Sequence, residues 1–326
     1  MKVLVTGAAG FIGSHVARLL VDRGDEVRFG LAPSERESPA TGTLPGERVC
    51  FDVRDLPAVR RAMSGVEAVV HLAAVYRTWA RDSRPMYQVN VSGTRNVLTA
   101  AEHEGVSKVV HTSSVAAVGL EPSGRPATEE TKFNQHGRAI HYALSKRYSE
   151  RVAMEFAARG LPVTVVNPSF PFGPGDRTPT PTGRLIVNIL KGWYFAHGPG
   201  GLNAVDVGDV ARGHLAALDS GVPGRRYLLT GHDLSWSDFF GAVKRIGGSR
   251  VPHLGVSPAV LYAMGLVGDV IGRFRAPLVD SRTVRYTNQD FCYDCSRARD
   301  ELGYRVTPLE DTLQRAVDWF RTEGYL

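Results

Sequence analysis

The sequence has little cysteine, which argues against a disulfide framework and against a structural zinc site. Three cysteines among 326 residues, Cys50, Cys292 and Cys295, cannot form a disulfide framework and favour a reducing compartment. Cys292 and Cys295 form one Cys-x-x-Cys pair and lack the second pair that a structural zinc site needs. We therefore expect no metal and two ordinary cysteines at a strand end, with a redox pair as the alternative.

Long hydrophobic runs and isolated basic blocks are also missing. The most apolar stretch, Val256 to Ile271, contains a proline, an aspartate and two glycines and is too short to cross a bilayer. The first residues enter a strand and a glycine turn directly, so we expect no signal peptide and a cytoplasmic protein. The net charge is +6, but basic and acidic residues are interspersed, which argues against nucleic acid and suits an anionic cofactor or substrate.

What the sequence does contain is an alternation of short β-branched segments with longer segments of helical apolar spacing. Hydrophobic residues make up 43% of the chain, enough for a large core. The alternation predicts a Rossmann fold of the α/β class, a doubly wound parallel sheet covered by helices. The expected strands are Lys2 to Thr6, Glu26 to Leu31, Ala68 to Leu72, Lys108 to Ser113 and Pro162 to Asn167, and the expected helices are Phe11 to Arg23, Leu56 to Gly65, Tyr87 to Glu104 and Tyr142 to Arg159.

A loop rich in proline, glycine and threonine, from Pro168 to Gly183, follows the last of these strands. Long loops in compact enzymes usually serve function. The chain is then expected to return to the sheet at Tyr227 to Thr230 and to build a smaller, discontinuous C-terminal part. We therefore expect a dinucleotide-binding domain in residues 1–167 and 203–231, and a substrate-binding part in residues 168–202 and 232–326.

Three glycines, Gly7, Gly10 and Gly13, follow the first expected strand and precede the first expected helix. In dinucleotide-binding proteins the first such glycine permits a tight turn, the second lets the backbone approach a diphosphate, and the third lets helix and strand pack closely. The free N–H groups at the start of the helix would bind that diphosphate. This order predicts a dinucleotide site, with a purely structural turn as the alternative.

The glycine spacing and several later motifs resemble the extended branch of the short-chain dehydrogenase/reductase family over nearly the whole chain. These motifs are Phe11-Ile12-Gly13-Ser14, Asp52-Val53, His71-Leu72-Ala73-Ala74, Asn90-Val91-Ser92-Gly93-Thr94, Thr112-Ser113-Ser114, Tyr142-Ala143-Leu144-Ser145-Lys146 and Gly173-Pro174-Gly175-Asp176. The resemblance implies an oxidoreductase that uses NAD or NADP. It implies cofactor contacts from Gly7, Gly10, Phe11, Ile12, Gly13, Arg36, Asp52, Val53, Leu72, Ala73, Ala74, Asn90, Lys146 and Pro168.

Tyr142 and Lys146 are four residues apart, which places both side chains on one face of a helix. We expect the Lys146 ammonium and the positive nicotinamide to lower the pKa of Tyr142 from about 10 towards a working range. Lys146 would also hold the cofactor ribose, and Ser114 would donate a hydrogen bond to the substrate oxygen, with Ser113 as the alternative serine. An ordinary amphipathic helix is the alternative interpretation of the pair.

The residues after the second expected strand bear on the choice between NAD and NADP. No acidic residue stands at the strand end, where it would hold the ribose diol of NAD. Ala32 occupies the position at which relatives often carry an arginine for the NADP phosphate. Ser34 and Arg36 could still reach a phosphate, so the balance favours NADP over NAD.

Two positions near the expected site favour a reductase over other members of the branch. Dehydratases of the family carry an acidic pair close to the serine, and this chain has Val115 to Val118 there instead. Sugar-nucleotide epimerases usually carry an asparagine at the position that Phe170 occupies in this chain. The resemblance therefore favours a dihydroflavonol 4-reductase-like enzyme that reduces a carbonyl of a flat or lipophilic small molecule.

Two alternatives stay open. Tyr76 to Asp82 and the loop from Thr178 to Arg184 also resemble a bacterial subgroup of hopanoid-associated sugar epimerases. A nucleotide-sugar or hopanoid-associated sugar epimerase with tightly bound NAD is thus the alternative enzyme. A nucleotide-sensing regulator on the same fold would be expected to lose Tyr142 or Lys146, and both are present.

The substrate is expected to bind an apolar surface formed by Trp79, Phe170, Phe172 and the segment from Leu261 to Val267. Met264 and the leucines of that segment would suit an adaptable lid. A core helix or a homodimer contact is the alternative for the segment, because apolar helical spacing alone cannot distinguish these roles.

Overall fold

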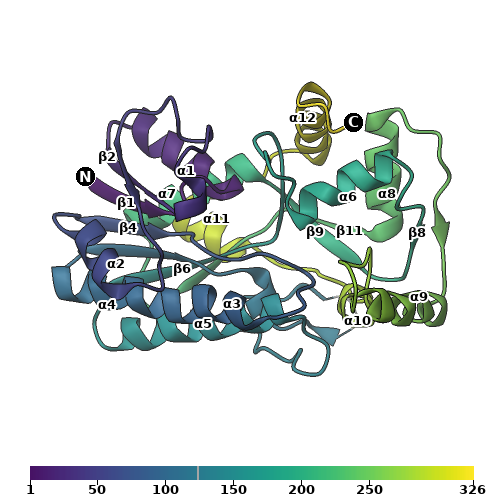
Figure 1. The fold of residues 1–326 in the computed structure, drawn as a ribbon, viewed down its shortest axis with the longest axis horizontal. Coiled ribbons are helices and arrows are strands. Elements are labelled where there is room, and N and C mark those ends of the chain that lie inside the picture. The colour runs from purple at the N-terminus through teal and green to yellow at the C-terminus, as the bar shows by residue number, and fades with distance from the viewer. Residues whose placement is uncertain (123–124) are drawn as a thin grey trace.

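A central parallel sheet forms the core of the computed structural model, which describes residues 1–122 and 125–326 (Figure 1). Its seven strands lie in the order β10-β6-β5-β4-β1-β2-β3. Strand order reverses between β1 and β4, the place at which doubly wound sheets bind their ligands. The predicted fold class is confirmed. The strands are β1 (Lys2–Thr6), β2 (Glu26–Leu31), β3 (Glu47–Cys50), β4 (Ala68–His71), β5 (Lys108–Thr112), β6 (Val163–Pro168) and β10 (Arg226–Leu229).

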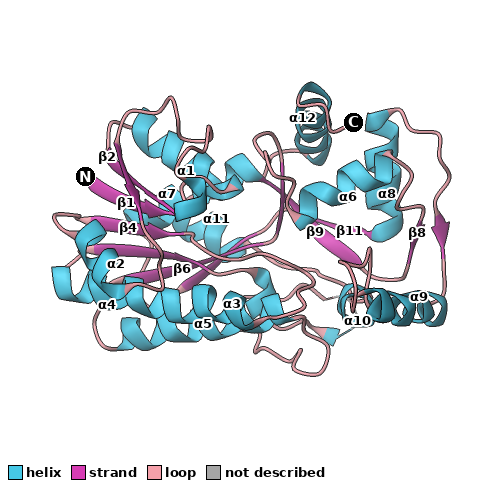
Figure 2. Cartoon of the chain, in the orientation of Figure 1, coloured by secondary structure: helices cyan, strands magenta, loops and turns pink. Residues whose placement is uncertain are grey.

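Helices cover both faces of this sheet, as Figure 2 shows. Side chains alternate between the faces of a strand, so Val3 and Val5 pack into one apolar cluster while Leu4 packs into the other. Because both clusters are apolar, the strands have no polar face. One face carries α1 (Phe11–Asp22), α7 (Val207–Ser220) and α11 (Ser296–Leu302), and the other carries α2 (Leu56–Met63), α4 (Thr94–Glu104) and α5 (His141–Ala158).

The helix predicted over Tyr87 to Glu104 is divided in the structure. A short helix α3 (Arg84–Tyr87) leads into a π-helical stretch, Gln88–Gly93, and α4 begins only at Thr94. Stretches of this kind are frequent at functional sites, because the wider turn redirects a side chain. Here the redirected residue is Asn90, which is 1% exposed and bonds outside its own helix.

The C-terminal part contains two small sheets and five helices. β9 pairs with β7 and β11 in a three-stranded sheet, and β8 pairs with β12. Phe172, Phe239 and Phe320 are among the fully buried residues of its core. The elements are β7 (Phe170–Phe172), α6 (Pro181–Leu190), β8 (Ala196–His197), β9 (Gly201–Asp206), β11 (His232–Ser235), α8 (Trp236–Gly247), β12 (Leu254–Gly255), α9 (Pro258–Ile271), α10 (Ser281–Thr287) and α12 (Leu309–Thr322), with α11 packed on the other part.

The two parts of the chain interleave along the sequence. β9 overlaps the start of the segment 203–231 that was expected in the dinucleotide-binding domain, yet it lies in the three-stranded sheet. α11 comes from the segment expected in the substrate-binding part, yet it packs against α7 and β10. The exact division of the chain into two domains stays a prediction.

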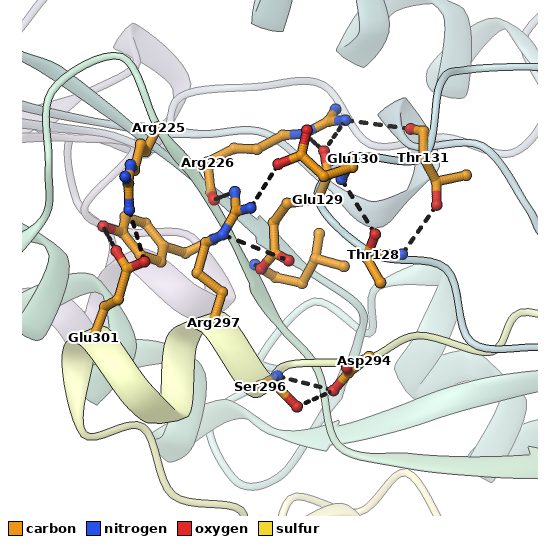
Figure 3. A network of polar contacts seen from close by, with 12 residues as sticks. Thr128, Glu129, Glu130, Thr131, Arg225, Arg226, Asp294, Ser296, Arg297 and Glu301 are labelled. Carbon is orange, nitrogen blue, oxygen red and sulfur yellow. Dashed lines mark hydrogen bonds and ion pairs between the residues drawn. The ribbon is translucent and has the colours of Figure 1, made fainter.

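A network of charged side chains joins the edge strand β10 to its surroundings (Figure 3). Arg226 of β10 donates from Nη1 to Glu150 Oε1 of α5 at 2.9 Å and from Nε to the Glu129 carbonyl at 2.7 Å. Arg297 of α11 bonds to Glu130 at 2.5 Å. Glu150 is 2% exposed, and Arg226 is the cation that forms a hydrogen bond with its buried carboxylate.

Three features bear on expectations made from composition. All three cysteines are free, and burial raises the pKa of Cys292 to about 11, so this thiol stays protonated. Among residues 1–122 and 125–326, no group of three or more His, Cys, Asp or Glu side chains is placed to hold a metal ion. None of the helices in the same ranges has the length and apolar character needed to cross a membrane.

Candidate active site

The glycine turn between β1 and α1 is closely packed. Gly7 has φ +70°, and a Cβ atom there would lie 2.8 Å from the Ala73 backbone nitrogen. A Cβ atom on Gly13 would lie 2.0 Å from the Gly7 carbonyl oxygen, so α1 packs against the turn as the sequence predicted. At Gly10 the corresponding distance is 3.2 Å, which leaves more space.

The start of α1 is suited to bind an anion. Gly10 caps the helix without a side-chain hydrogen bond, and the first turn carries no acidic residue. The N–H groups of the first turn therefore have no competing anion from within the helix, and the helix dipole adds to their attraction for a diphosphate. The residues present at this turn fit the dinucleotide that the sequence predicted.

A cavity of about 280 Å³ extends from this turn to the small sheet. Among the described residues that line it, Lys146 is the one charged side chain, and none is a carboxylate or an amide. The lining residues predicted from the sequence are Gly7, Gly10, Phe11, Ile12, Gly13, Leu72, Ala74, Ser114, Tyr142, Lys146, Pro168 and Phe170.

Tyr142 stands at the start of α5, in the wall of this cavity. Removal from bulk water raises the pKa of Tyr142 to about 12, and the neighbouring Ser114 hydroxyl opposes this shift. The expected lowering of this pKa depends on Lys146 together with a bound nicotinamide, so it stays a prediction for the complex with the cofactor. Burial disfavours the phenolate more than its polar neighbours stabilise it.

Lys146 lies one helical turn further along α5 and is 5% exposed. Its Nζ atom donates a hydrogen bond to the carbonyl oxygen of Thr112, the last residue of β5, at 2.8 Å. Burial lowers the pKa of Lys146 to about 8, and the negative charge of Glu150 opposes the shift. The lysine is thus held between the end of a strand and a buried carboxylate.

A buried chain of polar groups supports the backbone behind Ser114. Asn167 of β6 donates from Nδ2 to the Ser114 carbonyl at 2.9 Å and to Glu150 Oε2 at 2.7 Å. Glu150 in turn accepts from Arg226. Since Tyr142, Lys146 and Glu150 are four residues apart on α5, one helix face carries all three. The predictions missed Glu150, although this spacing was visible in the sequence.

Asn90 does not line the cavity. Its Nδ2 atom donates to Ser145 Oγ at 2.9 Å and to the Val75 carbonyl at 3.0 Å, and its Oδ1 atom accepts from the Val75 N–H at 2.7 Å. The side chain therefore joins the loop after β4 to α5. It holds two segments that reach the cavity at Ala74 and Tyr142.

Four other predicted cofactor residues lie outside the cavity lining. Asp52 accepts hydrogen bonds from the backbone and side chain of Arg54, which lowers its pKa. Val53 is buried against Gly93, and the Ala73 N–H donates to Thr6 Oγ1 at 3.3 Å. Arg36 is exposed just after the short 3₁₀ turn that follows β2.

The predicted apolar substrate surface is only partly assembled. Phe170 lines the cavity, with its ring centroid 5.7 Å from that of Phe291. Phe172 is 1% exposed and packs on Phe239 in the core of the small part, and Trp79 lies beside Gly272 instead. The segment from Leu261 to Val267 belongs to α9 and is not part of the cavity lining, so its role as a substrate wall stays a prediction.

Two tyrosines and a helix face were missed by sequence reasoning. The rings of Tyr76 and Tyr142 are 4.5 Å apart between centroids, and burial raises the pKa of both Tyr76 and Tyr286. Thr283, Tyr286 and Thr287 of α10 line the cavity. Their spacing of three and four residues marks one helix face, which is the signal that could have identified them.

Residues 3–229 match the model of the NAD dependent epimerase/dehydratase family. The chain belongs to this family. The resemblance to the extended short-chain dehydrogenases/reductases is thereby confirmed, and the chain is an enzyme of a family that depends on NAD and includes both reductases and epimerases.

Several relatives match this family member over their whole length. It is 34% identical to "Putative dihydroflavonol 4-reductase" from a Synechocystis species, over 99% of this chain and 95% of the relative. It is also 34% identical to sterol demethylase protein B from Methylococcus capsulatus, over 100% of both chains. A solved structure of a nucleoside-diphosphate-sugar epimerase from Pseudomonas aeruginosa is 29% identical, with a TM-score of 0.83, and the match covers 100% of this chain and 99% of that one.

Proposed function

We propose that this enzyme reduces a carbonyl group of a flat or lipophilic small molecule, with Tyr142 as proton donor. One observation carries the proposal: among described residues, the cavity that joins Tyr142 to the glycine turn is lined without any carboxylate or amide. A sugar needs such groups to bind its hydroxyls, whereas an apolar substrate does not. The similarity to relatives named dihydroflavonol 4-reductase, cinnamoyl-CoA reductase and 3 beta-hydroxysteroid dehydrogenase supports the same choice.

Tyr142, Ser114 and Lys146 would each have a separate role in the proposed reduction. The glycine turn and Lys146 would hold a nicotinamide cofactor, which would supply the hydride chemistry when bound. Tyr142, whose pKa of about 12 keeps its proton in place at neutral pH, would pass that proton to the substrate oxygen. Ser114 would orient the same oxygen by a hydrogen bond. Lys146 would hold the cofactor ribose and favour the tyrosinate left after transfer, because an ammonium stabilises a nearby phenolate.

We further propose NADP(H) as the preferred cofactor. Glu35, the nearest acidic residue after β2, accepts a hydrogen bond from the Ala32 N–H at 3.1 Å and is therefore engaged by its own turn. The exposed Ser34 and Arg36 flank it and are available to a phosphate. Asp52, Val53, Ala73 and Asn90 lie outside the lining of the cavity, and their contacts with the cofactor stay a prediction.

A second candidate is a nucleotide-sugar or hopanoid-associated sugar epimerase with tightly bound NAD. Thr78, Thr180, Thr182, Thr283 and Thr287 supply hydroxyl groups to the cavity. The similarity to the Pseudomonas aeruginosa epimerase favours this candidate too. It differs from the reductase in consuming no cofactor.

The two candidates are separated by one assay on the purified protein. NADPH or NADH is mixed with a flat aromatic ketone, a sterol ketone or a nucleotide sugar, and both cofactor absorbance and product are followed. The reductase predicts loss of cofactor absorbance with a ketone, and faster loss with NADPH. Interconversion of nucleotide sugars without net loss of cofactor would establish the epimerase instead.

A further inference from the structure

α9 exposes most of its large apolar side chains. Val260, Leu266, Val267 and Val270 are 49%, 47%, 62% and 56% exposed, and Phe274, just beyond the helix, is 83% exposed. Figure 1 shows α9 at the margin of the molecule, beside α10 and away from the central sheet. A contiguous apolar patch of this kind usually marks a site of interaction.

The orientation of α9 is fixed by its glycines. Gly265 and Gly268 are its two buried residues, and a Cβ atom on Gly268 would lie 1.8 Å from the Val279 carbonyl oxygen. At Gly265 a Cβ atom would lie 2.7 Å from the Ser281 Cα atom. The side of the helix without side chains thus packs on the protein, and the large apolar residues necessarily point outward.

The apolar patch continues onto the two-stranded sheet. Trp193, Phe195 and Leu254 are 59%, 50% and 58% exposed, and the Leu254 N–H bonds to the Phe195 carbonyl. Leu261 of α9 lies against Gly198, directly after β8. We call the exposed apolar side chains of α9, together with Trp193, Phe195, Leu254 and Phe274, the α9 surface.

Positive charge borders the α9 surface. Residues 250–285 contain five arginines and two aspartates, a sum of +3. Both aspartates are engaged: Asp269 accepts from the Ser281 N–H, and Asp280 caps α10. Arg273 and Arg275 flank Phe274, and Arg285 lies over the ring of Tyr262 at 5.7 Å.

We infer that the α9 surface docks on the surface of an anionic lipid bilayer. A helix that exposes aromatic and aliphatic side chains, with arginines in the segments beside it, can lie in the interface plane and be held by apolar burial and by anionic headgroups together. With 14 residues α9 is too short to span the hydrocarbon core, so it would rest on the bilayer and not cross it.

A second copy of the chain is a poorer occupant for the same surface. A twofold interface applies the same patch to itself, and here it would bring the arginines of one copy to those of the other. Anionic headgroups complement these charges, whereas a second copy repeats them. The charge pattern therefore favours the bilayer.

The α9 surface is next to a helix that lines the cavity. α9 packs on α10, and α10 contributes Thr283, Tyr286 and Thr287 to the cavity lining. If the proposed function is right, a lipophilic substrate dissolved in the bilayer would meet the protein next to its site. This link rests on the proposed function, but the docking itself does not.

Vesicle sedimentation tests the docking without any substrate. The full chain is mixed with vesicles of phosphatidylcholine alone or of phosphatidylcholine with phosphatidylglycerol, at low and high salt. The double variant Val267→Asp/Phe274→Asp places carboxylates on the α9 surface, and Val222→Asp is the matched control on an exposed valine of a distant loop. Circular dichroism checks that each variant is folded.

We expect wild-type protein and Val222→Asp to sediment with anionic vesicles, and the double variant to bind at least about tenfold more weakly. Added salt or Arg273→Gln/Arg275→Gln should weaken binding as well. Equal binding by wild type and folded double variant would overturn the inference. The inference would also be overturned if light scattering showed that the wild-type protein is a dimer and the double variant is a monomer. Absence of carbonyl reduction would not affect this test.

Discussion

At the scale of single residues, the hydroxyl of Tyr142 is the group on which the proposed chemistry depends. Tyr142→Phe removes this hydroxyl and keeps the ring that packs on Tyr76. We expect the rate of carbonyl reduction to fall by about 10² to 10⁴, while cofactor affinity, measured by fluorescence titration, changes little. A variant that turns over at the wild-type rate would rule out Tyr142 as proton donor.

Lys146 makes the activity depend on pH. Its pKa is lowered to about 8 by burial, so its ammonium is present below pH 8 and is lost above it. We expect kcat/KM for reduction to fall as pH rises through about 8, because this parameter reports the free enzyme. Lys146→Arg, which keeps its charge at all these pH values, should move the fall to higher pH. An unchanged profile in a folded Lys146→Arg protein would assign the fall to another group.

Phe170 separates the apolar site from a sugar site. Phe170→Asn places an amide in the apolar part of the cavity, and an unpaired buried amide costs about 1–3 kcal/mol. We expect ketone binding to weaken by about 5- to 150-fold. Phe170→Leu, which keeps an apolar side chain, is the control and should lose less. If the asparagine variant binds the ketone as well as wild type does, Phe170 does not contact the substrate.

At the scale of elements, the turn before α1 contains two glycines with different constraints. A Cβ atom on Gly13 would overlap the Gly7 carbonyl oxygen at 2.0 Å, whereas one on Gly10 would remain at 3.2 Å. Gly13→Ala should therefore lower the melting temperature clearly, and Gly10→Ala should lower it less. Gly10→Ala should instead weaken cofactor binding by about tenfold, since backbone must approach the diphosphate there. The opposite pattern in thermal melts and titrations would contradict the packing described here.

The sequence predicted elements where local rules decide the structure. The short apolar run Val3-Leu4-Val5 indicated a buried strand, and the glycines after it indicated the tight turn into α1. The π-helical stretch was not predictable, because it depends on hydrogen bonds that Asn90 makes to residues far away in the chain. The orientation of α9 was equally hidden, since apolar spacing does not reveal that the glycine side is the buried one.

The candidate site could be predicted only where spacing or strand ends place a residue. Tyr142 and Lys146 share a helix face, and Ser114 follows β5, so these three reach the cavity as predicted. Phe170 and Phe172 are two residues apart and share one side of β7, but only tertiary packing covers Phe172 with Phe239. Tyr286 reaches the cavity from the far end of the chain, and no local pattern connects it to Tyr142.

At the scale of the whole molecule, Arg226 connects the edge of the sheet to α5. Replacing it with methionine removes the hydrogen-bonded cation of the buried Glu150 and leaves Arg147 at 3.9 Å, which should lower the free energy of unfolding by up to about 3–5 kcal/mol. The adjacent Arg225 pairs with Glu301 near solvent, so Arg225→Met should cost about 0–1 kcal/mol. Denaturant titration of the two variants compares them. Equal losses would show that the burial of Glu150 does not raise the cost of removing its partner.

The stripe of Tyr142, Lys146 and Glu150 on α5 has a consequence for protein engineering. A helix rises by about 1.5 Å per residue, so Tyr142 and Glu150 are about 12 Å apart along the axis of α5 and move with the same helix. A substitution that shifts α5 to repack Glu150 would also shift Tyr142 in the cavity wall. Substitutions meant to raise the melting temperature should therefore avoid the residues around Arg226. Substitutions on the outer helices should raise it without lowering the turnover rate.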